Sequence, residues 1–246
     1  MILDQPSDFE SAPNIQKNVP RVMNAWASYD WANSVYNLTI TAAIFPVYYE
    51  ISTKNHFGGE TVLFFGREWI ASVLYAYAIA LSFLFAAILS PLLSGLADYG
   101  GKKKLFMQVF TYIGSAACMV LYFFDGSNVE LGVIAALIAS MGYSGAIVFY
   151  ISYLPDIASD DRMDSLSAKG FSLGFLGSVI QLFVSLAIIF NHSALGIPDE
   201  AQATRLSFLL VGLWWIGFAQ IAFFNLPSNI YNRKAEGNLF RQGFKE

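Results

Sequence analysis

Six apolar stretches, each long enough to cross a lipid bilayer, constrain the fold of this chain more than any other feature. A helix rises 1.5 Å per residue, so about 20 apolar residues span the hydrocarbon core. No lysine or arginine falls inside any of the six stretches. They cover residues 31–50, 70–97, 105–124, 131–154, 170–190 and 206–226. Because the chain is also 56% hydrophobic and only 13% charged, we expect an all-α, multi-pass integral membrane protein that sits in a lipid bilayer.

The basic residues outside these stretches are unevenly distributed. With six spans, both termini and the second and fourth loops lie on one side of the membrane, and only Lys54, Arg67 and Arg205 lie on the other. Since short cytoplasmic loops carry the excess of lysine and arginine, both termini are expected in the cytoplasm. Residues 1–25 are expected to form a poorly ordered cytoplasmic tail, residues 26–227 the six-span bundle, and residues 228–246 a basic tail or the start of a linker.

The same distribution excludes several kinds of partner and cofactor. The basic residues are accounted for by membrane orientation, so no nucleic-acid partner is expected. Cys118 is the single cysteine and falls within a span, which rules out an intramolecular disulfide and a thiolate metal site. We therefore expect no cofactor and no metal.

The loop between the second and third stretches carries the clearest motif. Residues 94–104 read Ser-Gly-Leu-Ala-Asp-Tyr-Gly-Gly-Lys-Lys-Lys. A carboxylate beside a glycine turn and a basic cluster can form ion pairs in one conformation of a protein and lose them in another. We expect such a conformational latch from Asp98, Gly101, Lys102 and Lys103. The alternative is a loop whose lysines only set the orientation of the chain.

This loop resembles the glycine-x-leucine-alanine-aspartate-arginine-x-glycine motif of the major facilitator superfamily, with Ser94 and Tyr99 replacing the first glycine and the arginine. Residues 26–34, 149–158 and 167–174 resemble the vacuole-effluxer branch of that superfamily. The bacterial and fungal members of this branch are called unknown major facilitators, and the fungal ones are associated with amino-acid efflux.

The resemblance implies a fold, a function and a partner. Transporters of this superfamily have twelve spans in two halves, so six spans form one half, expected here to be the N-terminal half built as a 3+3 inverted repeat. The second half would come from the same polypeptide or from another copy. The implied function is secondary-active transport of a small solute by alternating access, in the inner membrane of a bacterium. In this packing Asp156 can pair with the lysine cluster, at about 0.2–1 kcal/mol for each partly exposed pair.

A polar stripe runs along the first stretch. Asp30, Asn33, Asn37 and Thr41 are spaced by three, four and four residues, which places them on one face of a helix. Polar groups in a membrane must face protein or water, and an aspartate at the bilayer centre costs roughly 2.5–3.5 kcal/mol. We predict that this stripe lines a substrate cavity. The alternative for Asp30 is a helix-start aspartate at the membrane interface.

Three residues of later stretches are further candidates for this cavity: Tyr143, Tyr150 and Gln181. Gln181 shares a face with Ser185 and with the glycines at 170, 174 and 177. A face of small residues favours close helix packing, so Gln181 either bonds across helices or contacts the solute.

Other classes of function fit less well. The run Gly142-Tyr143-Ser144-Gly145 resembles the serine motif of rhomboid proteases, but that chemistry needs a histidine base near the serine. His56 and His192 both fall in loops on the side opposite the termini, so no enzyme activity is expected. Six spans also suit the membrane subunit of an ATP-driven transporter, or a scaffold that does not transport. A scaffold would not need the polar stripe.

Overall fold

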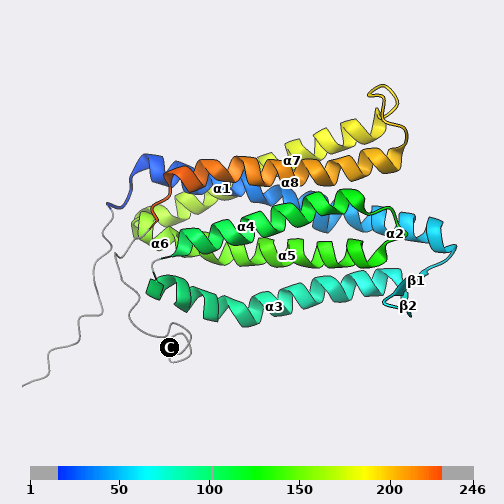
Figure 1. The fold of residues 1–246 in the computed structure, drawn as a ribbon. Helices are drawn as coiled ribbons and strands as arrows, with labels where there is room; N and C mark the ends of the chain where they lie inside the picture. Colours follow the sequence, from blue (N-terminus) through cyan, green and yellow to red (C-terminus); the bar gives the residue numbers. More distant parts are fainter. Residues whose placement is uncertain (1–15, 101, 229–246) are drawn as a thin grey trace, which may run out of the picture.

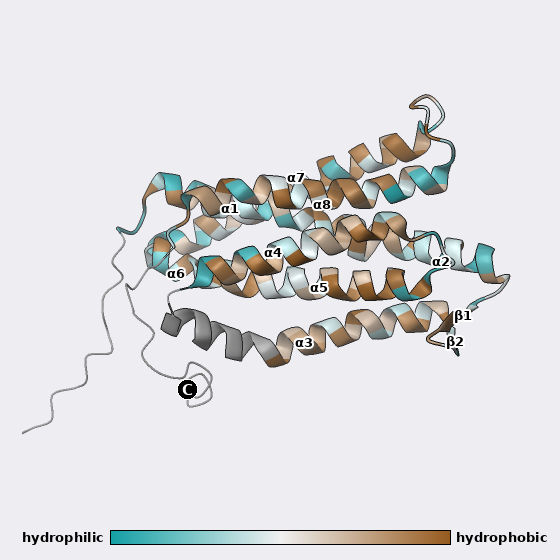
Figure 2. Cartoon of the chain, viewed as in Figure 1, coloured by the Kyte–Doolittle hydropathy of each residue, from teal (hydrophilic) through white to brown (hydrophobic). Residues whose placement is uncertain are grey.

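The computed structural model describes residues 16–100 and 102–228, and the side chains of 16–88 and 102–228. In these residues the chain forms a bundle of long helices that run side by side (Figure 1). The helical elements are α1 (Pro20–Val35), η1 (Tyr36–Ala43), α2 (Phe45–Phe57), α3 (Ala71–Gly100), α4 (Lys103–Val120), η2 (Leu121–Phe123), α5 (Val129–Ser152), α6 (Leu154–Ile157), α7 (Asp160–Phe190) and α8 (Glu200–Asn225). Hydrophobic residues dominate the middle of the long helices, and hydrophilic residues gather near the helix ends and loops (Figure 2).

Five helical segments in the described residues are long and apolar enough to cross a membrane. They contain α3, α4 with η2, α5 with α6, α7, and α8. These correspond to the second to sixth predicted stretches. The helices extend further than the apolar stretches: α7 begins at Asp160 and α8 at Glu200. Both extensions carry acidic residues in the first turn, which the positive end of the helix dipole favours.

The first predicted stretch is not one regular helix, and six regular spans are therefore not confirmed. α1 passes into η1, a π-helical segment in which Ile44 N–H bonds the Thr39 carbonyl five residues earlier at 3.0 Å. α2 then begins with Pro46 in its first turn, where the missing proline N–H costs no hydrogen bond. The three segments together still run from one end of the bundle to the other (Figure 1).

Part of the predicted N-terminal tail is helical. Residues 20–25, expected to belong to a tail, form the start of α1. Just before this helix, Asn18 N–H donates to the Ile157 carbonyl at 2.8 Å, and the Asn18 side chain bonds Ser159. The expectations for residues 1–15 and 229–246 lie outside the described residues.

A β-hairpin departs from the all-α expectation. Strands β1 (Thr61–Phe64) and β2 (Arg67–Ile70) pair antiparallel, with Val62 opposite Trp69. Phe65 and Gly66 between them both have positive φ, which is the backbone of the tightest hairpin turn. The Phe65 N–H donates to Glu130 at the start of α5 at 2.8 Å, so the hairpin is attached to the end of the bundle.

Glycines allow the closest helix contacts. A Cβ on Gly142 of α5 would lie 2.5 Å from Gly114 Cα of α4, so two backbones touch here. On α7, a Cβ on Gly174 would lie 2.5 Å from Ser34 Oγ and 3.2 Å from Asp30 Cβ. The small-residue face of the fifth stretch thus packs against α1.

The two ends of the described chain lie at the same end of the bundle (Figure 1). Arg21 of α1 donates to the Asn225 side chain of α8 at 2.6 Å, and Lys104 of α4 donates to the Leu226 carbonyl at 2.9 Å. Basic side chains thus hold helix ends together at this end of the bundle, which the charge distribution predicts to be cytoplasmic.

This orientation can be tested with a reporter that fluoresces only in the cytoplasm. Fused after Glu246 the reporter is expected to be bright, and inserted at Gly196, where a Cβ meets nothing within 4 Å, it is expected to be dark. Whole-cell fluorescence, normalised to the amount of protein on a blot, measures both. Bright signal from both fusions would contradict the predicted topology.

Candidate functional site

The Asp30 carboxylate lies half-buried where α1, α5 and α7 meet. Tyr150 of α5 donates its hydroxyl to Asp30 Oδ2 at 2.9 Å. Gly170 of α7 lies directly against this pair, because a Cβ there would be 2.9 Å from Oδ2 and 2.8 Å from the Tyr150 hydroxyl. In the described residues no hydrogen bond is made by Oδ1, so one carboxylate oxygen can still accept from a ligand.

Aromatic side chains hold Tyr150 in place. Trp26 stacks on Tyr150 with ring centroids 4.2 Å apart, and its indole N–H donates to the Tyr150 carbonyl at 2.8 Å. Tyr29 lies 5.2 Å from the Tyr150 ring, and its hydroxyl hydrogen-bonds Thr111 at 2.6 Å. A carboxylate beside aromatic rings in a largely apolar surrounding can accept a proton or bind a cationic group.

The predicted polar stripe divides into two sets. Asn37 is exposed, and its side-chain amide donates to the Tyr143 hydroxyl of α5 at 2.7 Å. Asn37 and Tyr143 therefore form a second hydrogen-bonded pair, which a solute can reach from outside the bundle. Asn33 is fully buried, with its Nδ2 lacking a partner in the described residues, and the same holds for Thr41 Oγ1. The wider turn of the π-helical η1 explains why Asn37 and Thr41 face different ways, because a spacing of four residues no longer keeps side chains on one face there. Asn33 lies before η1, in α1, where its three-residue step from Asp30 falls about 60° short of a full turn.

Gln181 bonds within the protein. Its Oε1 accepts from the Thr39 hydroxyl of η1 at 2.5 Å, and its Nε2 donates to Ser185 at 2.9 Å. Gln181 is only 1% exposed, and its amide connects α7 to η1. This contact corresponds to the first of the two expected roles, a hydrogen bond across helices rather than a contact with the solute. Thr39 was not among the predicted residues, since it lies off the four-residue spacing.

The structure pairs one lysine of the predicted latch with Asp156. Lys103 Nζ lies 2.8 Å from Asp156 Oδ2 and donates to the Ser152 carbonyl at 3.2 Å. The two side chains are only 7% and 4% exposed, so the partly exposed pair expected from the sequence is a buried one. Lys102 is exposed, and no ion pair involves it among the described residues. Gly101 and the side chain of Asp98 lie outside the described residues.

The interior also holds polar atoms that no sequence pattern singles out. The Tyr36 hydroxyl, the Ser115 hydroxyl and the Trp215 indole N–H are buried without a hydrogen-bond partner in the part of the chain that the structure describes. Tyr36 stacks on Tyr143 with centroids 5.1 Å apart and lies 5.8 Å from Trp215. Tyrosine and tryptophan occur in many apolar helices, so only tertiary packing shows that Tyr36 and Trp215 both lie against Tyr143.

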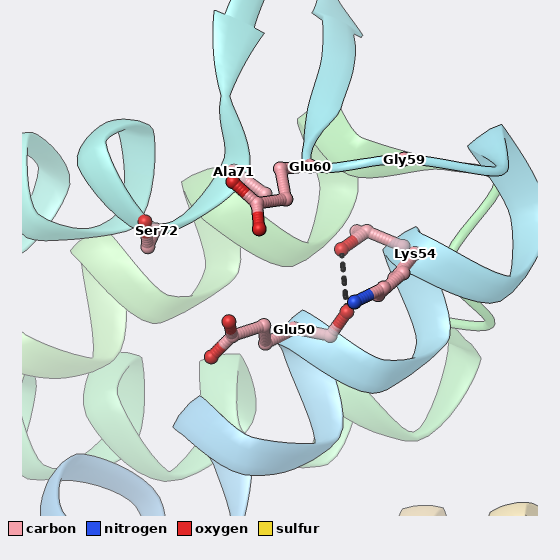
Figure 3. A pocket seen from close by; sticks show the side chains of 7 residues that line it. Glu50, Lys54, Gly59, Glu60, Ala71 and Ser72 are labelled. Carbon is pink, nitrogen blue, oxygen red and sulfur yellow. Dashed lines mark hydrogen bonds between the residues drawn. The ribbon is translucent and has the colours of Figure 1, made fainter.

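A small polar cavity of about 90 Å³ lies beside the hairpin. The carboxylates of Glu50 and Glu60 and the hydroxyl of Ser72 point into the same space (Figure 3). This volume suits a few water molecules rather than a solute. Within the described ranges, no group of three or more histidine, cysteine, aspartate or glutamate side chains is placed to hold a metal.

Comparison with known proteins supplies the family. The model of the family described as "Vacuole effluxer Atg22 like" matches residues 18–246. The chain belongs to this family. Against the uncharacterized MFS-type transporter YxiO of Bacillus subtilis it is 34% identical over 233 residues, which are 94% of the chain and 52% of YxiO. No solved structure matches the chain.

Fungal members of the Atg22-like family are more distant. Autophagy-related protein 22 of Pyricularia oryzae is 20% identical over 313 residues, which cover 95% of the chain and 44% of that protein. Autophagy-related protein 22-1 of Penicillium rubens is 22% identical over 244 residues, which cover 73% of the chain and 39% of that protein. The chain thus spans about half the length, or less, of these relatives. Membership agrees with the resemblance seen in residues 26–34, 149–158 and 167–174, and with a multi-pass membrane protein that is not an enzyme.

Proposed function

We propose that this Atg22-like chain is the N-terminal half of a secondary-active transporter that moves a small solute by alternating access. In this proposal α1, η1 and α2 together form the first of six spans, arranged as a 3+3 inverted repeat. Both termini are cytoplasmic, in a bacterial inner membrane, and a second six-span half completes the solute path. Two observations support this proposal over an ATP-driven subunit or a non-transporting scaffold. The chain belongs to the Atg22-like family, and it covers about half the length of the MFS-type transporter YxiO.

The Asp30 carboxylate carries the proposal for the solute site. It keeps one oxygen free of bonds to the described residues, although it lies among aromatic rings where an ionised group is costly. Such a group persists in a membrane protein when it has a role in binding. Asp30, Asn37, Tyr143 and Tyr150 would contact the solute, and Asn33, Thr41 and Gln181 would support the helices behind them.

The latch supplies the conformational change in this proposal. Lys103 of α4 and Asp156 of α6 hold two helix ends together at the end predicted to be cytoplasmic. Asp98, Gly101 and Lys102 would complete the latch. A pair that forms in one state and breaks in the other shifts the equilibrium between them by the difference in its free energy.

The solute class that we propose to test first is the amino acids, each of which carries an ammonium group that can donate a hydrogen bond to the Asp30 carboxylate. Asp30→Asn keeps the size and hydrogen-bonding capacity of the side chain and removes its charge. Because a hydrogen bond to a charged group is worth about 1.5–3 kcal/mol, efflux is expected to fall about tenfold or more. Loss of labelled amino acids from preloaded cells that express the full-length protein measures this rate.

Asp161→Asn is the matched control, since the Asp161 side chain is 77% exposed and lies away from Asp30. It is expected to leave efflux unchanged, and both variants are expected to reach the membrane in wild-type amounts. If the Asp30→Asn protein exports amino acids at the wild-type rate, Asp30 does not bind the solute and is only a helix-start aspartate at the membrane interface. Efflux of no amino acid by the wild-type protein would contradict the proposed solute class.

A further inference from the structure

A second cavity, of about 460 Å³, lies at the end of the bundle away from the chain termini. It is a partly open pocket bordered by the end of η1, α2, the last turns of α7 and the first turns of α8, and most of its lining is apolar, including Ile44, Val47, Leu186 and Ile189. This volume falls in the range of about 300–1,000 Å³ typical of small-molecule sites. The Asp30 site lies elsewhere, where α1, α5 and α7 meet, so the cavity is independent of the proposed function.

The close contacts of α7 with its neighbours end before this cavity. Over its first half, glycines at 170, 174 and 177 bring α7 against α1. Gln181 makes a polar contact to η1 through Thr39. Beyond that point α7 presents large residues such as Leu186 and Phe190 on this side, and it diverges from the other helices toward its end (Figure 1). The gap that results is a property of the packed helices rather than of a loop.

Most of the polar side chains that line the cavity form hydrogen bonds within the protein. The Ser52 hydroxyl donates to the Tyr48 carbonyl at 2.6 Å, and the Thr204 hydroxyl donates to the Glu200 carbonyl at 2.8 Å. Glu200 is the one charged residue in the lining, it is exposed, and its carboxylate has no hydrogen bond or ion pair in the described residues. The cavity therefore offers an apolar interior with a single negative charge at its edge.

We propose that this cavity binds an acyl chain of a phospholipid whose headgroup carries an ammonium group, with the Glu200 carboxylate accepting from that ammonium. Apolar walls do not hold water, and an empty space of this size loses the dispersion contacts of its lining. In a membrane-spanning chain such a space can be filled by a lipid tail or by a helix of the proposed second half, and the lone Glu200 carboxylate at its edge favours the lipid. A carboxylate complements an ammonium headgroup such as that of phosphatidylethanolamine, and it repels a headgroup with only a net negative charge.

Native mass spectrometry of the whole chain in detergent tests the site, with phosphatidylethanolamine and phosphatidylglycerol of identical acyl chains as probes. Leu186→Trp fills the cavity, and it is expected to weaken binding of phosphatidylethanolamine about tenfold because the tail loses its apolar contacts. Leu176→Trp is the matched control on the same helix, since Leu176 is exposed and does not line the cavity. If Leu186→Trp does not fold, Val47→Trp at the same cavity takes its place.

The headgroup is tested separately. Wild-type protein is expected to prefer phosphatidylethanolamine over phosphatidylglycerol several-fold, and Glu200→Gln is expected to remove that preference. Glu68→Gln, on the exposed face of the hairpin, is expected to keep it. Equal binding by the Leu186→Trp and Leu176→Trp proteins would show a non-specific lipid shell and overturn the site. An unchanged preference in Glu200→Gln would overturn the role of the carboxylate.

Discussion

Replacing Asp156 with asparagine is expected to lower the free energy of unfolding by about 3 kcal/mol, the lower end of the range for breaking a buried ion pair. The effect is large because Lys103 stays buried, at 7% exposure, after it loses the carboxylate 2.8 Å away. Lys103 keeps other partners, among them the Ser152 carbonyl, which accepts from its Nζ, so the expected loss is at the lower end of the range. Denaturant titration in detergent measures the change.

The double variant Lys103→Met with Asp156→Leu provides the internal control. Replacing both members by apolar residues removes both buried charges, so stability is expected to recover most of what either single change removes. Asp164→Asn, at an exposed carboxylate close in sequence, is expected to cost less than about 0.5 kcal/mol. Additive losses in the double variant would show that Lys103 and Asp156 are not coupled, and would leave the lysines of this loop only the role of orienting the chain.

Gly142→Ala is expected to destabilise the bundle by about 2–3 kcal/mol, the upper part of the range for overpacking. The added methyl would lie 2.5 Å from Gly114 Cα, 2.6 Å from Gly114 N and 2.8 Å from the Phe110 carbonyl oxygen. All three atoms are backbone, so α4 and α5 must move apart to admit the methyl group. Thermal unfolding followed by circular dichroism measures the loss.

Gly217→Ala is the matched control in α8, because a Cβ there meets nothing within 4 Å. It is expected to be neutral or to stabilise by up to about 1 kcal/mol, since alanine favours helix over glycine. Equal stability of the two variants would contradict the contact between α4 and α5. The same contact explains the run Gly142-Tyr143-Ser144-Gly145 by helix packing, since a Cβ on Gly145 would overlap the Phe110 ring.

Part of the site could be read from single residues. Asp30 stands out because a carboxylate beside an apolar stretch is costly. Tyr143 and Tyr150 on the fourth stretch are candidates for the cavity because their hydroxyls are polar groups within an apolar span. The structure places Tyr150 on Asp30 and Tyr143 on Asn37. Helical spacing did not predict that the Thr41 hydroxyl turns inward, because regular spacing fails where η1 adopts π-helical turns. It also did not predict that Asn33 of α1 is buried while Asp30 is only half-buried, because burial depends on which neighbouring helix packs against each side chain.

The sequence by itself determined where the apolar helices lie and which end of the bundle gathers basic residues, since hydropathy and charge act through each residue's own transfer free energy. Tertiary structure decided the partners: Lys103 rather than Lys102 meets Asp156, Gln181 meets Thr39, and α7 leaves a cavity beside α2. These contacts join residues far apart in the chain. They depend on how closely two backbones approach, and that distance is set by packing of whole helix faces rather than by any local pattern.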